Sequence, residues 1–459
     1  MKAESDFEYR KALGARILSE ANDLKRTRQA MAVELGVEPA LVDSVINGQA
    51  SLEEALDLVR SMAAHYPISL LNLWLEADDT DDGAVIMRAA DSVATARVFD
   101  RKNATGELTP YYEYRDTAMT RIGPFKPEWI SELRFVDDAD PDNPDVAYNN
   151  GHLMHQQTFF VGEVNFYWSL DGKNHCAEMN TGDSNYITPF VPHSFTSRNP
   201  NKPGLIIAVT FGGETRRALD EFSRLDGNSS ETLAGDLRDR AAAYGARLAR
   251  RLATDSMSPS DLTDRLVGSG HDAARATQLA KGALPGSHDE TVSIAAALGV
   301  RAEDLMVSAL EPGHEVVLQY ADESMPRPLL SNNAVNCHLR ELARTKHLPD
   351  MKGFSVDVVG AADDAPPFQH HLFEYVFNYG DAPVALLWGE NREAVLRSGD
   401  SVCFRPMVKH QFARLEDEGT GRLCVVRVPG ALTDSGLDEY ARFPSDGRRR
   451  VSGETKQWF

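Results

Sequence analysis

Two histidines and a glutamine in the first half of the chain have the types and spacing of a metal site. His152 and Gln156 lie four residues apart in NNGHLMHQQTFF, and His193 follows in PHSF. Non-haem Fe(II) oxygenases hold iron with two imidazoles and one oxygen donor, usually a carboxylate, on one face of the metal. Glutamine is a neutral donor, so it leaves one more positive charge on the metal, which a dianionic substrate could offset.

The second half of the chain carries a similar set in which the oxygen donor is a carboxylate. His370, Glu374 and His410 have nearly the same spacing as the first three residues. By donor chemistry alone this second set is the better iron site. The residues therefore leave open whether the first set, the second set or both bind a metal, and whether the second is a further site or a vestige.

His155 is an alternative ligand in the first half. It stands three residues after His152, and an odd spacing in an extended strand directs two side chains to opposite faces. Positions 152 and 156 share a face, so we prefer Gln156 as the third ligand and expect His155 and Gln157 to point away.

The two sets belong to an internal repeat. GDSNYITPFVPHSF (182–195) matches GDSVCFRPMVKHQF (399–412), and HLMHQQTFFVG (152–162) matches HHLFEYVFNYG (370–380) in length and at both ends. Both matches share an offset of about 217 residues, and a common offset over separate motifs indicates a duplicated unit.

Each repeat unit must position its set with a helical part followed by a strand-rich part. Residues 27–51 predict helix, turn and helix, with Thr27 as N-cap and stops at Gly36 and Gly48, and residues 258–282 are a weaker copy. Short β-rich runs separated by turn residues then predict a small antiparallel barrel. The expected fold class is α+β, a tandem repeat of a helix-turn-helix-like domain and a cupin barrel. The expected domains are 1–85 (helical), 86–228 (first cupin barrel, with the active site), 229–312 (helical repeat) and 313–459 (second cupin barrel).

Composition argues against several functional classes. The net charge of −21 opposes contact with nucleic acid or an anionic membrane, and no apolar stretch is long enough for a membrane span. The second helix of the first helical part, PALVDSVINGQ, contains no basic residue, although KRTR (25–28) precedes it. The four scattered cysteines and the lack of an apolar signal core predict a cytoplasmic protein. A cupin-type transcriptional regulator and a metal-free structural bicupin are the rival classes.

The whole arrangement resembles a family of phosphonate-processing non-haem iron enzymes. The family comprises 2-hydroxyethylphosphonate dioxygenase, methylphosphonate synthase and hydroxypropylphosphonate epoxidase. The resemblance covers nearly the full chain, and its motifs are NNGH (149–152), PHSF (192–195), YYEY (111–114) and Lys25 ahead of the Thr27 cap. It implies a cytoplasmic enzyme with a small phosphonate as partner. Members of the family tend to form dimers or tetramers, so a homo-oligomer is one alternative, and the residues leave the oligomeric state open.

The third ligand distinguishes the members of this family. The dioxygenase takes a carboxylate six residues before the last histidine, where this chain has Ile187. The epoxidase takes a glutamate four residues after the first histidine, where this chain has Gln156. Methylphosphonate synthases resemble this chain at both positions, so the pair favours that branch over the dioxygenase.

The resemblance also implies a role for each matching residue. His152, Gln156 and His193 would hold Fe(II). Lys25 would lie near the phosphonate or the O₂ position, and Ile187 would shape the reaction at the metal. Ser256 aligns with Lys25 in the second unit, which implies one active site per chain.

Three further residues would bind the phosphonate. The resemblance gives Asn149 and Tyr114 as hydrogen-bond partners of its oxygens. The family has an arginine eight residues before that tyrosine, where this chain has Gly106, so Arg101 or Lys102 would have to fill the role. We expect Arg101.

The implied reaction is Fe(II)- and O₂-dependent carbon–carbon cleavage of 2-hydroxyethylphosphonate. The products would be methylphosphonate and carbon dioxide or bicarbonate. The substrate supplies all the electrons, so neither 2-oxoglutarate nor another reductant is implied. The alternative is the dioxygenase outcome, hydroxymethylphosphonate and formate.

Overall fold

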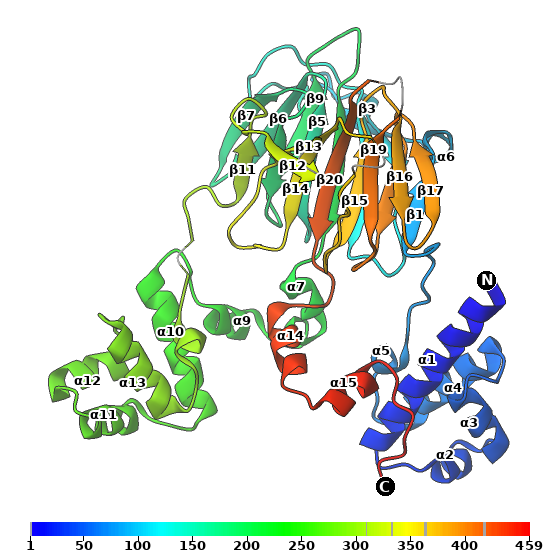
Figure 1. The fold of residues 1–459 in the computed structure, drawn as a ribbon. Helices are drawn as coiled ribbons and strands as arrows, with labels where there is room; N and C mark the ends of the chain where they lie inside the picture. Colours follow the sequence, from blue (N-terminus) through cyan, green and yellow to red (C-terminus); the bar gives the residue numbers. More distant parts are fainter. Residues whose placement is uncertain (1, 309, 332–333, 362–364, 416–418) are drawn as a thin grey trace.

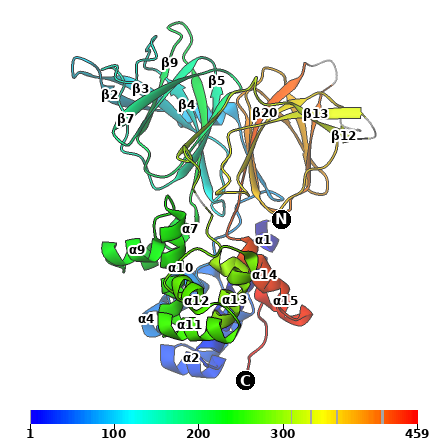
Figure 2. The same ribbon diagram turned by 90° about the vertical axis from the view of Figure 1, so that its left-hand side faces the viewer.

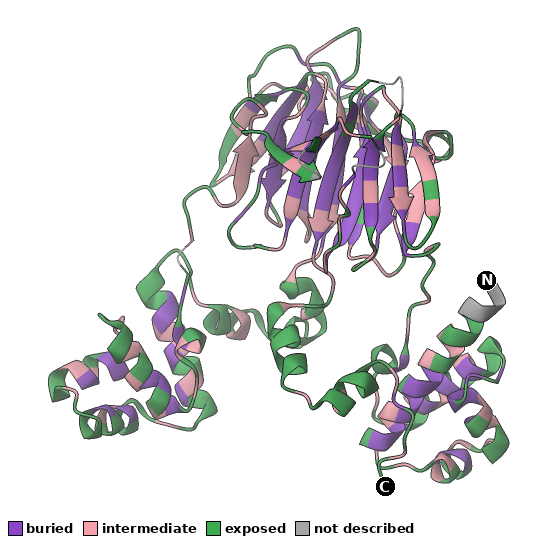
Figure 3. Cartoon of the chain, in the orientation of Figure 1, coloured by how far each residue is buried: buried purple, intermediate pink, exposed green. Residues whose placement is uncertain are grey.

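The computed structural model describes residues 2–308, 310–331, 334–361, 365–415 and 419–459. Helices and strands are segregated: two pairs of sheets lie side by side, and the helical parts lie beneath them (Figures 1 and 2). The strands are mostly buried, whereas the helical parts expose much of their surface (Figure 3). Among the described residues, none of the helices has the length and apolar character that crossing a membrane requires.

The first helical part has its own apolar core and the predicted helix ends. Thr27 caps the second helix by accepting a hydrogen bond from the Ala30 amide, and Gly36 ends that helix in the left-handed conformation, in which glycine is favoured. Gly48 also has a positive φ, of 71°, after the third helix. The helices are α1 (Lys2–Asp23), α2 (Arg28–Leu35), α3 (Pro39–Ile46), α4 (Leu52–His65) and α5 (Leu70–Leu73).

The second helical part has the same unusual backbone conformation as the first at one aligned position. Lys25 and Ser256, which align in the sequence, are both non-glycine residues with positive φ, 58° and 50°. Such a φ is uncommon for a non-glycine residue, so its recurrence supports the proposed alignment. The helices here are α10 (Arg240–Thr254), α11 (Pro259–Gly268), α12 (Ala273–Ala280), α13 (His288–Leu298) and the 3₁₀ turn η1 (Ala302–Leu305). Short connecting or terminal helices are α6 (Ala89–Ala94), α7 (Glu214–Arg217), α8 (Leu219–Phe222), α9 (Gly227–Ala234), α14 (Asp434–Ala441) and α15 (Ser445–Val451).

Each sheet pair consists of a seven-stranded and a three-stranded antiparallel sheet among the described residues, and the two pairs have the same strand order. We call them the first and second sheet pairs. The first has the orders β11-β8-β5-β10-β4-β3-β2 and β7-β6-β9, and the second has β1-β18-β15-β20-β14-β13-β12 and β17-β16-β19. The first comprises β2 (Arg97–Lys102), β3 (Leu108–Asp116), β4 (Phe125–Glu132), β5 (His155–Val161), β6 (Val164–Leu170), β7 (Lys173–Met179), β8 (Ser184–Ile187), β9 (His193–Ser197), β10 (Leu205–Phe211) and β11 (Val316–Gln319). The second comprises β1 (Ala84–Met87), β12 (Arg327–Ser331), β13 (Ala334–Glu341), β14 (Lys352–Val358), β15 (Phe373–Asn378), β16 (Val384–Trp388), β17 (Arg392–Leu396), β18 (Ser401–Phe404), β19 (His410–Arg414) and β20 (Gly421–Val428).

The two units exchange their edge strands, a feature that the predicted division of the chain did not include. The strand β1 precedes the first unit in sequence but pairs with β18 of the second sheet pair. The strand β11 precedes the second unit but pairs with β8 of the first. The expected boundaries near 85 and 312 therefore do not separate the strands of the two sheet pairs, and the exchange ties the two units together.

Apolar cores lie inside each sheet pair and between the two. Phe160, Phe166 and Phe195 belong to the core inside the first sheet pair. A separate core joins the outer faces of the two large sheets and includes Phe159 from the first and Tyr375 from the second. Since neighbouring residues in a strand face opposite sides, Phe159 and Phe160 contribute to two different cores.

Candidate metal centre

The fold brings the first set together at one end of the first sheet pair. Gln156 lies in β5 of the large sheet, and His193 begins β9 of the small sheet that faces it. His155, the first residue of β5, pairs with Phe211, the last residue of β10, which leads to α7. In Figure 1, α7 lies just below the sheets, so the set lies at the end that faces the helical parts. His152 lies in the loop before β5, whereas the sequence predicted that it shares an extended strand with Gln156.

The side chains of the first set converge. His152 Nε2 lies 3.3 Å from Gln156 Oε1. The rings of His152 and His193 have centroids 5.3 Å apart and are nearly perpendicular, at 87°. Gln156 and His193 are buried, and His152 is half-buried. Two imidazoles and an amide oxygen thus share one small, partly enclosed space.

Backbone contacts fix the imidazoles in the orientation that metal ligation requires. His152 Nδ1 donates to the Met154 carbonyl at 3.0 Å, and His193 Nδ1 donates to the Val191 carbonyl at 2.8 Å, if each carries its proton on Nδ1. This tautomer leaves Nε2 without a proton, so its lone pair can bind a metal, and a metal-ligating histidine usually makes this kind of contact through its other nitrogen. Burial lowers the pKa of His193 to about 4, so its imidazole is neutral at neutral pH, the form that binds metals. The donor set therefore fits a divalent metal.

Thr158 fixes the orientation of the Gln156 amide. The Gln156 amide nitrogen donates to Thr158 Oγ1 at 2.9 Å, so the amide oxygen is turned towards His152. Oxygen is the donor atom of an amide that binds hard metal ions. The hydroxyl of Thr158 is thus a contact that selects the ligating atom, and the sequence alone did not identify it.

We predict that Thr158→Val weakens iron binding by about tenfold to hundredfold, the usual effect of removing a partner of a metal ligand. Valine has nearly the same shape as threonine but cannot accept a hydrogen bond, so the Gln156 amide is free to rotate. The affinity is measured by anaerobic titration with Fe(II). Thr158→Ser, which retains the hydroxyl, is the control, and equal affinities for all three proteins would contradict this role.

The side chain of Asn149 binds backbone amides through its oxygen and approaches His193 through its nitrogen. Its Oδ1 accepts hydrogen bonds from the amides of Gly151 and His193, at 2.9 Å each. Its Nδ2 lies 3.0 Å from His193 Nε2, on the side of the ring that faces the set. A ligand bound at the set would therefore find the Asn149 amide donor beside it.

Gly151 allows the turn that carries Asn149 and His152. Its φ is +69°, and a Cβ there would lie 2.5 Å from the carbonyl carbon of Phe190. Both the conformation and the close approach of the Phe190 backbone require a residue without a side chain.

We predict that Gly151→Ala destabilises the protein by about 2–4 kcal/mol, combining left-handed strain with overpacking, and lowers its iron content. Gly106→Ala is the matched control, because Gly106 has φ +83° with no atom within 4 Å of the added Cβ, so only the backbone strain of about 1 kcal/mol applies. Urea denaturation and metal analysis provide the measurements. Equal effects of the two substitutions would show that the approach of Phe190 does not matter.

His155 and Gln157 face away from the first set, as predicted. His155 Nδ1 and the Tyr186 hydroxyl form a hydrogen bond of 2.7 Å, and the imidazole stacks on Phe211. Gln157 Nε2 donates to the carbonyl of Ala343, which belongs to the second unit. Gln157 therefore belongs to the contact between the two sheet pairs, whereas the contacts of His155 lie within the first.

Ile187 lies directly across from Gln156 in the ladder between β5 and β8. Residues opposite each other in an antiparallel pair direct their side chains to the same face. Ile187 is buried in the core inside the first sheet pair. The position next to the Gln156 amide is thus apolar and offers no further ligand.

Arg101 and Tyr114 lie on the neighbouring strands β2 and β3. The Arg101 guanidinium lies 5.7 Å from the ring of Tyr111 and 5.6 Å from that of Tyr112. Burial raises the pKa of Tyr114, and the positive charge of Arg101 opposes that shift. The same charge contributes, after burial, to the lowered pKa of His193. Arg101 is therefore close to both the expected phosphonate-binding tyrosine and a residue of the first set.

Arg134 is a second cation in this region, and sequence reasoning missed it; unlike Arg101 it is buried. Its guanidinium lies 4.9 Å from the Tyr111 ring and donates to Thr109 Oγ1 at 2.5 Å and to the carbonyl of Asp145 at 2.8 Å. No local motif marks it, since these partners lie in two other segments of the chain, β3 and the loop at Asp145. These contacts hold the strand that carries the tyrosines.

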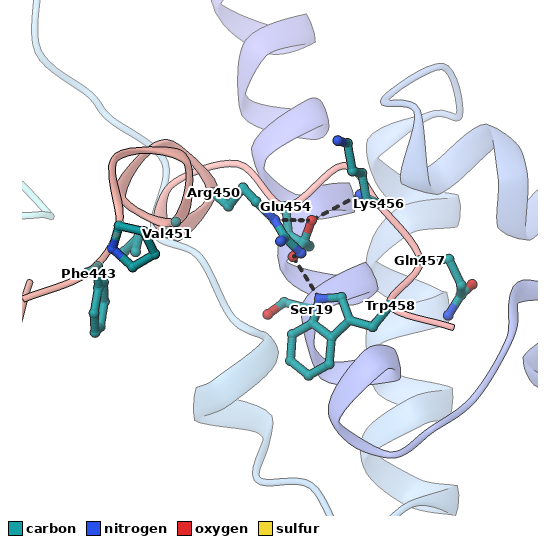
Figure 4. A pocket seen from close by; sticks show the side chains of 10 residues that line it. Ser19, Phe443, Arg450, Val451, Glu454, Lys456, Gln457 and Trp458 are labelled. Atoms are coloured by element: carbon teal, nitrogen blue, oxygen red, sulfur yellow. Dashed lines mark hydrogen bonds and ion pairs between the residues drawn. The ribbon is translucent and has the colours of Figure 1, made fainter.

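Lys25 has its described contacts within the helical part and with the C-terminal tail. Its ammonium donates to the carbonyls of Asn22 and Asp23 and lies 5.4 Å from the Trp458 ring. Figure 4 shows the pocket that Trp458 lines between the tail and α1. The corner between α1 and α2 lies below the sheets in Figures 1 and 2, and none of the described contacts joins Lys25 to the first set. Its expected place at the phosphonate stays a prediction.

Most positive charges of the basic cluster at residues 25–28 are paired with acidic side chains. Arg26 pairs with Glu34 at 2.8 Å, and Arg28 pairs with Asp43 at 3.0 Å. Two of its three cations thus already have acidic partners within the helical part.

The second set also converges, with one addition. His370, Glu374 and His410 offer ligand atoms that lie within 4.8 Å of one another, a spacing that one metal ion could bridge. Arg427, which the sequence did not indicate, donates to Glu374 Oε2 at 2.5 Å. Burial would raise the pKa of Glu374, but the charges of His410 and Arg427 outweigh it and hold that pKa well below its usual range.

Comparison with known proteins covers the whole chain. The methylphosphonate synthase of Nitrosopumilus maritimus (strain SCM1) is 34% identical over 468 residues, which span 100% of this chain and 98% of that protein. The (S)-2-hydroxypropylphosphonic acid epoxidase of Streptomyces wedmorensis is 29% identical over 191 residues, 41% of this chain and 89% of the epoxidase. No family model matches the chain.

Solved structures with the same fold exist. Streptomyces albus HEPD, with its substrate 2-hydroxyethylphosphonate and Fe(II) bound, is 32% identical, covers 98% of this chain and 100% of its own, and has a TM-score of 0.87. The native PhpD structure with cadmium atoms covers 96% of this chain and 99% of its own with a TM-score of 0.73, at 18% identity, which shows a common fold.

Proposed function

Because this chain belongs to the methylphosphonate synthase family, we propose that it cleaves 2-hydroxyethylphosphonate to methylphosphonate and carbon dioxide or bicarbonate, with Fe(II) and O₂. The observation that carries the proposal is the pair Gln156 and Ile187, which face each other across β5 and β8 beside two histidines. Neither position supplies the carboxylate that the dioxygenase and the epoxidase would place there. The four-part division into two helix-turn-helix-like modules and two cupin barrels is proposed with it.

His152, Gln156 and His193 would hold Fe(II), which when bound supplies the Lewis acidity and the electron transfer that activation of O₂ needs. Bound to a metal, two imidazoles and an amide oxygen would all be neutral ligands, so the ion would keep its full double charge. A phosphonate dianion would neutralise that charge in a buried space, where the attraction is stronger than in water. The neutral glutamine therefore suits a doubly charged substrate.

The other residues of the site would bind and enclose the substrate. The Asn149 amide and Arg101 would bind the phosphonate oxygens, together with the Tyr114 hydroxyl, and Lys25 would join them if the corner between α1 and α2 approaches the site. Ile187 would exclude water from the Gln156 side. Exclusion of water favours methylphosphonate, because water reaching the one-carbon fragment would lead to hydroxymethylphosphonate.

The overall reaction balances without an external reductant. One 2-hydroxyethylphosphonate and one O₂ give one methylphosphonate, one carbon dioxide and one water. The dioxygenase products, hydroxymethylphosphonate and formate, contain the same atoms. Consumption of O₂ therefore does not distinguish the two outcomes, and the phosphorus product must be identified.

Phosphorus NMR of a single reaction mixture tests the proposal. The protein is loaded anaerobically with Fe(II), given 2-hydroxyethylphosphonate and then exposed to O₂ without 2-oxoglutarate or a reductant. The expected result is a methylphosphonate signal that accounts for the substrate consumed. Hydroxymethylphosphonate as the main product would establish the dioxygenase outcome, and unchanged substrate would contradict the proposed activity.

A further inference from the structure

Both oxygens of the Glu374 carboxylate already contact polar side chains of the second sheet pair. Its Oε1 lies 2.7 Å from His410 Nε2, and its Oε2 lies 2.9 Å from His370 Nε2 and 2.5 Å from Arg427 Nε. The Glu374 side chain has no exposed surface, and that of Arg427 is 16% exposed. A buried carboxylate needs a cationic partner, and here Arg427 already provides one.

The same position in the first sheet pair carries no cation. Thr210 is the β10 residue opposite Gln156, and Arg427 is the β20 residue opposite Glu374. The first sheet pair thus has the neutral pair Gln156 and Thr210 where the second has the ion pair Glu374 and Arg427. The positive charge of the arginine cancels the negative charge of the glutamate, so the net charge at this place is the same in both sheet pairs.

Aromatic rings hold the guanidinium and cover the histidine beside it. Arg427 lies 5.2 Å from the Phe354 ring and 5.5 Å from the Phe368 ring. Phe404, at the place of Ile187 in the repeat, stacks on His410 with centroids 4.2 Å apart, and Phe368 stacks on the same ring at 5.6 Å. The first set has instead the amide of Asn149 beside its last histidine. Among the described residues, the second set therefore has no equivalent amide donor beside its last histidine, and it is packed against apolar rings.

We propose that the guanidinium of Arg427 takes the place of a metal cation in the second sheet pair. A divalent ion at this set would stand next to a fixed positive charge that already neutralises the one anionic ligand, and like charges in a buried space repel strongly. The second set is then an internal ion-pair cluster, and each chain binds one metal ion, at the first set. The second sheet pair serves to bury the outer face of the first, through the core that contains Phe159 and Tyr375.

Metal content in the absence of substrate tests this inference separately from the proposed reaction. Each protein is incubated anaerobically with Fe(II), desalted and analysed for iron per chain. We expect one iron for the wild type, none for His193→Ala, two for Arg427→Thr and one for the double variant. Thr is chosen because Thr210 occupies the corresponding place. Arg422→Thr is the matched control: Arg422 lies on the same strand but is exposed, and its replacement should leave one iron.

Three results would count against the inference. Iron retained at one per chain in His193→Ala would show that the second set binds metal with Arg427 in place. Iron unchanged at one in a folded Arg427→Thr protein would show that the guanidinium does not keep the metal out. If Arg427→Thr is unstable without metal, Fe(II) should raise its melting temperature more than that of His193→Ala, since binding to the native state stabilises it. An equal rise in the two would count against the proposal.

Discussion

Replacing His193 with alanine is expected to remove the bound iron and to lower kcat/KM for 2-hydroxyethylphosphonate by about a thousandfold or more. His193 is buried, it is neutral at neutral pH, and its Nδ1 contact with the Val191 carbonyl turns Nε2 towards His152 and Gln156. Metal catalysis contributes several kcal/mol to the lowering of a barrier, and each 1.36 kcal/mol corresponds to a factor of ten in rate.

The matched control is His410→Ala, the corresponding change in the second unit. If the first set is the metal centre, this variant retains one iron and most of its activity, although the loss of the contact with Glu374 should lower its stability. Iron analysis and phosphorus NMR on both variants separate the two sets. Full activity in His193→Ala together with loss of activity in His410→Ala would place the reaction in the second unit.

Changing Gln156 to glutamate is expected to keep iron bound but to weaken the binding of the phosphonate by about tenfold to hundredfold. The added negative charge strengthens the hold on the metal and lowers the net charge that faces the dianion; one unit charge some 6 Å away is worth about 3 kcal/mol at an effective dielectric constant near 20. The balance between methylphosphonate and hydroxymethylphosphonate should shift as well, because a substrate held less firmly admits water.

Iron content, KM and the product ratio from phosphorus NMR are measured together for this variant. Gln156→Leu is the comparison, since it removes the oxygen donor and should lose iron. If Gln156→Glu and Gln156→Leu both matched the wild type in iron content, KM and products, Gln156 would not be a ligand.

The sequence was informative where neighbouring residues decide the structure. Thr27 and Gly36 delimit α2 by contacts within four residues of the chain, and both assignments were confirmed. The match between residues 27–51 and 258–282 aligned Lys25 with Ser256, and the two residues share an unusual left-handed backbone conformation. Strand periodicity also separated Gln156 from His155 and Gln157, which the structure places on the other face.

Features that depend on the pairing of strands far apart in the chain could not be predicted from the sequence. The exchanged strands β1 and β11 are four residues each, too short to carry a pattern that would assign them to one sheet or the other. Arg427 reaches Glu374 because β20 pairs with β15, and the register of that ladder decides which side chain faces the carboxylate. An arginine in a mostly apolar strand gives no signal of its own until the register is known.

Anomalous scattering at the iron edge, on crystals loaded anaerobically with Fe(II) and 2-hydroxyethylphosphonate, tests the central claim most directly. We expect one peak per chain, among His152 Nε2, Gln156 Oε1 and His193 Nε2, with the phosphonate beside it and no peak at Glu374. A peak at the second set and none at the first would contradict the account.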